Sequence, residues 1–210
     1  MSDVTRIRRL PERTVADMEE IHAILDDGFV CHAAYITNGR PVVIPTLYAR
    51  DGDRVLLHGS NSSGLARAVR ESSPLSVAVT HIDGIVVARS GFHSSANYRS
   101  VVIHGHGELL EGREHEHALD VIVDWLIPGR LADLRPPTGS ELKQTSVMAI
   151  SIEQVSAKVR SGGPKDDPAD LASEIWAGVI PIEETRGDPV PAPDLGAAIG
   201  LPDYLRTHLG

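Results

Sequence analysis

Residues suited to binding an anion are concentrated in one loop, which runs from His58 to Arg67 with the sequence HGSNSSGLAR. Its glycines and hydroxyl groups, Ser60 and Ser63 among them, let the backbone approach an anion closely, and Arg67 adds a full positive charge. A helix beginning after the loop would direct the positive end of its dipole at the same anion. The loop therefore predicts a phosphate cradle; the alternative is a capped surface loop. It matches neither GxGxxG nor GxxxxGKS/T, which excludes Rossmann and P-loop sites.

A second segment, Tyr98-Arg99-Ser100-Val101, places an arginine and a hydroxyl group at the mouth of an expected strand. Together with the loop, Arg99 and Ser100 would supply the second side of one phosphate site. The alternative is an ordinary pair of surface residues on an edge strand.

Ten histidines and a single cysteine offer further chemistry. His104 and His106 would share one face of a strand, which is a workable geometry for a metal or a haem. No acidic residue at matching spacing completes a metal site nearby, so hydrogen-bonded or solvated histidines are the alternative. Cys31 lies in an apolar segment and is expected in the core, and one cysteine excludes an internal disulfide. The absence of a GxSxG motif argues against a serine hydrolase.

The elements that would position these residues are mainly strands. Helical spacing predicts a first helix that begins at Thr14 and ends at Gly28. Strands are expected over 29–37, 41–48, 54–58, 75–81, 85–89, 101–110 and 147–152, with hairpin turns at Asn38-Gly39, Asp51-Gly52 and Asp83-Gly84. Further helices are expected over 65–71, 114–126 and 171–177. The fold class is therefore mainly β, and antiparallel strands joined by hairpins close naturally into a small barrel.

Composition narrows the function classes. The 210 residues carry a net charge of −9, and aromatic residues make up 4%, which argues against nucleic-acid binding. No apolar run approaches the ~18 residues of a membrane span, and no apolar stretch follows Arg6, Arg8 and Arg9 as in a signal peptide. We therefore expect a cytoplasmic protein. After Arg160 the chain becomes acidic and rich in proline, which divides it into a domain over 1–160 and an extension over 161–210.

Several short motifs, in this order and spacing, resemble the pyridoxamine 5′-phosphate oxidase-like FMN-binding split β-barrel superfamily. The closest resemblance is to its branch of nitroimidazole-resistance-type and flavin-nucleotide-binding proteins. It covers about Leu10 to Arg160. The motifs are Val43-Ile44-Pro45-Thr46, Val55-Leu56-Leu57-His58-Gly59-Ser60, Gly64 with Arg67, Tyr98-Arg99-Ser100-Val101-Val102 with Gly105, Leu142-Lys143-Gln144-Thr145-Ser146-Val147, and Ser156-Ala157-Lys158.

The resemblance implies a six-stranded split barrel and a homodimer that binds FMN at its interface. The extension would pack on the barrel or on the partner. The FMN-binding residues that it implies lie along the flavin ring (Val43, Ile44, Pro45, Thr46, His58, Gly59, Ser60) and at the phosphate or ribityl chain (Arg67, Arg99, Ser100). Ser63 of the loop and Lys158, which matches a family lysine, complete this set.

The resemblance also implies an FMN-dependent oxidoreductase acting on a small-molecule substrate, with His58 as the catalytic residue beside the flavin. The residues near the C-terminus that grip pyridoxine phosphate in the oxidase itself have no match in this acidic extension. A non-catalytic flavin-binding or storage module is the alternative, as is a member that binds haem or the deazaflavin F420.

Overall fold

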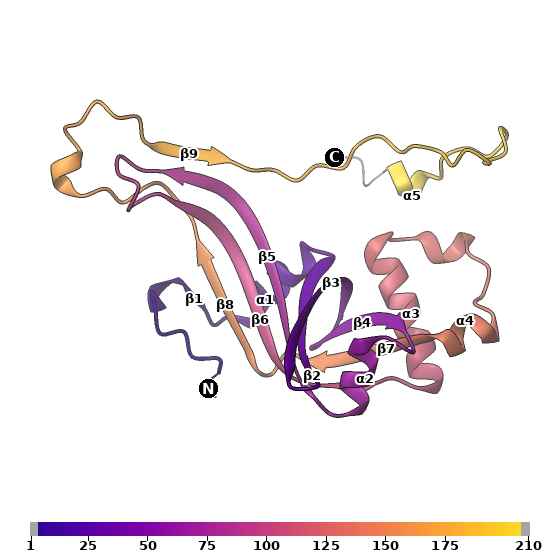
Figure 1. Ribbon diagram of the computed structural model, residues 1–210. Coiled ribbons are helices and arrows are strands. Elements are labelled where there is room, and N and C mark those ends of the chain that lie inside the picture. The colour runs from indigo at the N-terminus through magenta and orange to yellow at the C-terminus, as the bar shows by residue number, and fades with distance from the viewer. Residues whose placement is uncertain (1–3, 207–210) are drawn as a thin grey trace.

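Six antiparallel strands of the computed structural model, which describes residues 4–206, close into a ring (Figure 1). Neighbouring strands pair around the ring in the order β2-β3-β4-β7-β6-β5 and back to β2. Three shorter strands lie outside it, because β8 and β1 extend the sheet beyond β6 and β9 pairs with β5. The predicted six-stranded split β-barrel is confirmed.

The strands are β1 (Thr14–Val15), β2 (Val30–Thr37), β3 (Arg40–Asp51), β4 (Arg54–Ser60), β5 (Pro74–Val87), β6 (Ser95–Leu109), β7 (Thr145–Ser151), β8 (Val155–Arg160) and β9 (Gly178–Pro181). The α-helices are α1 (Met18–Asp26), α2 (Gly64–Arg70), α3 (Gly112–Leu126), α4 (Gly139–Gln144) and α5 (Asp203–Arg206), and the 3-10 helices are η1 (Pro11–Arg13), η2 (Arg130–Asp133) and η3 (Pro168–Asp170). None of these helices is both long and apolar enough to cross a bilayer.

The barrel is split because one edge of β6 changes its partner along its length. Residues 98–103 of β6 pair with β8, whereas residues 107–109 pair with β7. The first part of β6, together with β5, therefore extends beyond the ring as a long hairpin (Figure 1). This change of partner lets one strand belong both to the closed ring and to the open sheet.

Three predictions about the elements are wrong. Thr14 begins the short strand β1 rather than a helix, and Asp17 caps α1 by accepting a hydrogen bond from the amide of Glu19. Asp83-Gly84 forms no hairpin turn: β5 runs through it with a shift in register between Ile82 and Gly84. β9 pairs with β5 there, and a Cβ at Gly84 would lie 3.0 Å from the carbonyl of Ile180. The helix predicted over 171–177 is absent, because the chain there makes only an exposed turn after η3.

The core has two parts, one on each side of the barrel wall. Inside the ring lie the alternate side chains of the strands, closed off by α1 and by the apolar face of α2; Cys31 is fully buried there, as predicted, and burial raises its thiol pKa to about 12. Outside the ring, α3 packs Ala118 and Ile122 against Ala49 and Leu56. The wall of the barrel therefore carries apolar side chains on both faces where α3 covers it.

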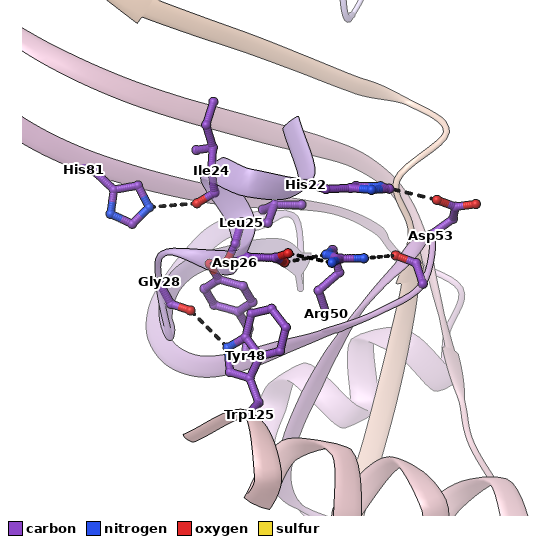
Figure 2. Close-up of polar contacts among 11 residues, drawn as sticks. His22, Ile24, Leu25, Asp26, Gly28, Tyr48, Arg50, Asp53, His81 and Trp125 are labelled. Atoms are coloured by element: carbon purple, nitrogen blue, oxygen red, sulfur yellow. Dashed lines mark hydrogen bonds and ion pairs between the residues drawn. The ribbon is translucent and has the colours of Figure 1, made fainter. Parts of the chain in front are cut away.

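The end of α1 is held by side chains from three other elements (Figure 2). The hydroxyl of Tyr48 donates to the carbonyl of Leu25 at 2.5 Å, and Nε2 of His81 donates to the carbonyl of Ile24 at 2.9 Å. The indole of Trp125 donates to the carbonyl of Gly28 at 3.0 Å. Carbonyls at a helix end lack partners further along the helix. His81 and Tyr48 donate to two such carbonyls, although that of Leu25 also accepts from the amide of Gly28 at 3.4 Å, and Trp125 binds the chain just beyond the helix.

We expect Gly28→Ala to destabilise the fold. A Cβ atom at Gly28 would lie 2.8 Å from Cε1 of His81 and 2.9 Å from the hydroxyl of Tyr48, so both donors would have to move. The expected loss in the free energy of unfolding is about 1–3 kcal/mol, as for overpacking. Chemical denaturation measures it, with Gly91→Ala as the matched control, since nothing lies within 4 Å of a Cβ there. Equal stability of the two variants would contradict this account.

Candidate functional site

Strand alternation sorts the predicted site residues between the two faces of the barrel wall. On β3, Ile44 packs against the core inside the ring, whereas Val43 is 59% exposed on the outside. Pro45 shares the outer face and Thr46 the inner one, because successive side chains point to opposite faces. On β4, Leu56 packs under α3 outside the ring, and His58, two residues further on, follows it to the same face.

His58 opens into a cavity of about 710 Å³ between the barrel wall and the segment from α3 to α4. The cavity is mostly apolar: α3 contributes Leu119, Ile122 and Val123, and the following segment contributes Leu131, Leu134, Pro136, Pro137 and Leu142. Polar lining comes from Asp120, Thr145 and the ion pair of Arg135 with Glu141, at 2.5 Å. Its volume lies within the roughly 300–1,000 Å³ typical of small-molecule and cofactor sites.

The imidazole of His58 makes no hydrogen bond to the described residues of the barrel wall. Its Nδ1 atom is buried and has no hydrogen-bond partner among the described residues. Burial lowers the pKa of His58 below its ordinary value, since desolvation disfavours the charged imidazolium. The ring is therefore neutral near pH 7. Because Nδ1 is closed off, a ligand in the cavity would meet the imidazole at Nε2.

The loop between β4 and α2 takes the predicted position at a helix start. Ser63 caps α2 by accepting a hydrogen bond from the amide of Ala66 at 3.1 Å, and the hydroxyls of Ser60 and Ser62 lie 3.0 Å apart. The two glycines differ in role. A Cβ at Gly64 would lie 2.6 Å from the hydroxyl of Tyr35, so close packing requires this glycine, whereas Gly59 faces open space apart from Ser63.

On the outside of the ring, one face of the sheet carries small, apolar and polar residues that no described helix covers. One row across β3, β2, β5, β6 and β8 consists of Pro45, His32, Ala78, Val102 and Ser156. The next row carries Val43, Ala34, Ser76 and His104. Ile36, on the same face of β2, is 46% exposed. We call this surface the outer sheet face. Its exposed apolar side chains are of the kind that contact a partner.

Arg99 and Ser100 do not act together within one chain. They are neighbours in β6, so alternation sends their side chains to opposite faces. The guanidinium of Arg99 is bound by Asp83 at 2.9 Å and by Asp27, which together raise its pKa. The hydroxyl of Ser100 donates to the carbonyl of Lys158 at 3.4 Å, and the ammonium of Lys158 donates to the carbonyl of Arg9 at 2.9 Å.

Arg67 and Arg99 lie at separate ends of the molecule. Arg67 is exposed on α2, and a Cβ at Gly107 of β6 would lie 2.9 Å from Val69 of the same helix. Arg99 precedes Gly107 by eight residues, roughly 26 Å along the strand at about 3.3 Å per residue. One chain therefore does not bring the two arginines to a single phosphate group, and their joint role stays a prediction that requires a second chain.

Sequence reasoning missed the wall opposite His58. Leu131, Leu134 and Arg135 follow α3 in a segment without regular spacing, so no periodic signal marked them as lining a cavity. His104 and His106, considered for a metal, are hydrogen-bonded: Nδ1 of His104 lies 2.8 Å from the hydroxyl of Ser76, and Nδ1 of His106 lies 3.0 Å from the carbonyl of Ser72. The described residues contain no group of three or more metal-ligating side chains.

Comparisons with known proteins agree with this architecture. The family model of pyridoxamine 5′-phosphate oxidase matches residues 17–159. An FAD- and haem-binding protein from Mycobacterium smegmatis is 38% identical, with a TM-score of 0.91 over 94% of this chain and 98% of that one. The flavocytochrome Anf3 from Azotobacter vinelandii is also 38% identical, with a TM-score of 0.94 over 100% of this chain and 98% of that one.

More distant structures share the fold alone. A nitroimidazole resistance protein homologue from Bacteroides thetaiotaomicron is 20% identical, with a TM-score of 0.58 over 70% of this chain and 86% of that one. A comparison with the curated proteins found no match.

Burial of a neutral His58 predicts a specific dependence of stability on pH. Because the folded state lowers the pKa of His58, the unfolded state binds the proton more readily, and stability falls as the pH drops below the ordinary pKa of about 6.5. We expect the stability difference between the parent protein and His58→Leu to shift in favour of the variant between pH 8 and pH 5. Urea denaturation across this range measures it, and parallel curves for the two proteins would contradict the expectation.

Proposed function

Because the chain belongs to the pyridoxamine 5′-phosphate oxidase family, we propose that it binds a flavin nucleotide and a haem, and that it acts as an oxidoreductase. The observation that carries the proposal is the neutral, unpartnered His58 in an apolar cavity of cofactor size. Similarity over nearly the whole chain to an FAD- and haem-binding protein and to a flavocytochrome supports it.

The residues around the cavity fit a haem. Haem iron is commonly held by a histidine imidazole. The ring of His58 lines the cavity, and because its Nδ1 atom is buried, a ligand in the cavity would meet Nε2. The apolar lining from α3 and from the segment after it would surround the macrocycle. Arg135, at the edge of the cavity, is already paired with Glu141. His58 would then hold the haem iron rather than act as the proton donor beside the flavin that the resemblance implies.

The flavin would use a different surface. The resemblance assigns three groups to the flavin. These are the outer face of β3 at Val43 and Pro45, the open space at Gly59, and the hydroxyls of the loop before α2. The similarity to an FAD- and haem-binding protein favours FAD over the FMN expected from the sequence. Mass spectrometry of the released cofactor distinguishes FAD, FMN and F420.

A second copy of the chain would complete the flavin site. The outer sheet face carries exposed apolar side chains such as Val43 and Ile36, and Arg67 and Arg99 lie too far apart in one chain to share a phosphate. A homodimer formed through the outer sheet face would cover its exposed apolar side chains. It would also bring Arg67 of one chain toward Arg99 of the other, since a two-fold axis places different ends of two chains together. We place this dimer in the cytoplasm, as the single cysteine suggests.

Bound flavin and haem would supply electron-transfer chemistry, and the protein would orient them and exclude water. An enzyme and a storage module differ in turnover. If the protein is an oxidoreductase, it consumes many equivalents of a reduced nicotinamide nucleotide, or of another donor, per flavin in the presence of a small electron acceptor. A storage module stops after one equivalent.

We expect His58→Ala to lose haem and to retain flavin. Loss of an axial ligand should weaken haem binding by at least about 10–100-fold, the range for disturbing groups that merely support a metal ligand. Titration with haemin, followed by the Soret band, measures this affinity, and quenching of flavin fluorescence measures that of FAD. His93→Ala, at the remote hairpin tip, is the matched control. Unchanged haem affinity would remove His58 as the ligand.

We expect Arg67→Ala to weaken FAD and FMN but to leave riboflavin nearly unchanged. A hydrogen bond to a charged group contributes about 1.5–3 kcal/mol, and riboflavin lacks the phosphate. Calorimetric titration with the three flavins measures the difference. Equal losses for riboflavin and FMN would show that Arg67 acts on the ring or on folding instead.

A further inference from the structure

The segment after β9 is the most exposed part of the described chain. Residues 182–200, which we call the C-terminal arm, are exposed throughout, and they include Val190, at 90%, and Ile199, at 62%. Figure 1 shows the arm running from β9 across the molecule, well clear of the barrel, to α5. Exposed apolar residues on an ordered segment indicate a contact surface for a partner.

Both ends of the arm are fixed to the body of the protein. At its start, β9 pairs with β5, and the amide of Ile182 donates to the carbonyl of Asp83 at 3.2 Å. At its end, the hydroxyl of Tyr204 donates to Asp133 at 2.7 Å and accepts from Arg130 at 2.8 Å. The arm is therefore a strap held at two points, not a free tail.

The arm between these points is stiff but makes only local contacts in its backbone. Prolines at positions 189, 191 and 193 favour an extended backbone. Two backbone hydrogen bonds in its interior close turns of the arm itself, from the amide of Leu195 to the carbonyl of Ala192 and from the amide of Ile199 to the carbonyl of Gly196. Ordering such a segment costs conformational entropy, and its own few contacts offset little of that cost. Burial of its apolar side chains against another surface would offset more of it.

The charges of the arm point to what covers it. The arm carries four carboxylates, Glu183, Glu184, Asp188 and Asp194, and one arginine. The segment over 4–13, which we call the basic segment, carries four arginines, Arg6, Arg8, Arg9 and Arg13, and one glutamate. The two segments are complementary in charge, yet they lie on different sides of one molecule, with the basic segment beside β1 and β8 (Figure 1).

We infer that the C-terminal arm is an interaction surface for a second copy of this chain and lies against the basic segment of that copy. Two-fold symmetry then forms the contact twice, since each chain offers one arm and one basic segment. The inference rests on the homodimer in the proposed function, and it adds a contact distinct from the outer sheet face. Charge complementarity of this kind mainly selects the partner and its orientation.

A charge-reversal experiment tests this contact. Glu183→Lys with Glu184→Lys, and separately Arg6→Glu with Arg9→Glu, should each weaken the dimer by at least about 10-fold at low salt, because like charges then face one another. The four substitutions combined should recover most of the lost affinity, as expected for a direct pair. Sedimentation equilibrium over a concentration series measures the dimer Kd. Glu153→Lys with Glu174→Lys is the charge-matched control and should leave it unchanged.

Two results would overturn the inference: an unchanged dimer Kd for the reversed arm, or no recovery in the combined variant. Replacing residues 183–200 by a Gly/Ser segment of equal length provides an independent variant that keeps β9 and Tyr204, and it too should weaken the dimer. FAD and haemin titrations of the same samples separate the two proposals. A dimer sensitive to the arm but without cofactor supports this contact and contradicts the proposed cofactors, whereas a monomer that binds both does the reverse.

Discussion

The hydrogen bonds around the end of α1 connect this helix to the barrel strands and to α3, and the candidate site depends on that connection. Donors from β3, β5 and α3 meet the carbonyls of Leu25, Ile24 and Gly28 in one place (Figure 2). The indole of Trp125 reaches this point from the last turn of α3, so the helix that covers His58 is fastened to the barrel there. A buried carbonyl without a partner costs about 1–3 kcal/mol, so each donor that satisfies one helps to hold this junction together.

The cavity follows from how α3 sits on the wall. Its apolar stripe packs on Ala49 and Leu56, and the wall beyond them continues to His58, where the helix no longer fills the space. The segment after α3, which includes η2, closes the space. The hydroxyl of Tyr204 in α5 holds η2 through hydrogen bonds with Arg130 and Asp133. A histidine that strand alternation places outside the barrel thus becomes half-buried and neutral, with its Nδ1 atom buried and its ring lining the cavity.

Of the basic residues predicted to bind the cofactor, two have partners within the chain and one is exposed. Arg99 is neutralised by Asp27 and Asp83, and Lys158 is directed at a backbone carbonyl, so both contribute to holding α1 and η1 against the sheet. Arg67 has no such assigned role and remains exposed beside the loop before α2. A phosphate ligand would therefore meet Arg67 at little cost, whereas recruiting Arg99 would require breaking two ion pairs.

The sequence by itself determined the local elements and the family. Turn residues at Asn38-Gly39 and Asp51-Gly52 and the spacing of apolar residues in 114–126 predicted most strands and α3, because these signals act over a few residues. Only the tertiary structure decided that β5 continues through Asp83-Gly84 with a shift in register, where β9 from a distant part of the chain pairs with it. It also decided that His58 faces a cavity and that Arg67 and Arg99 lie apart, because strand pairing between distant segments fixes which face and which end each side chain occupies.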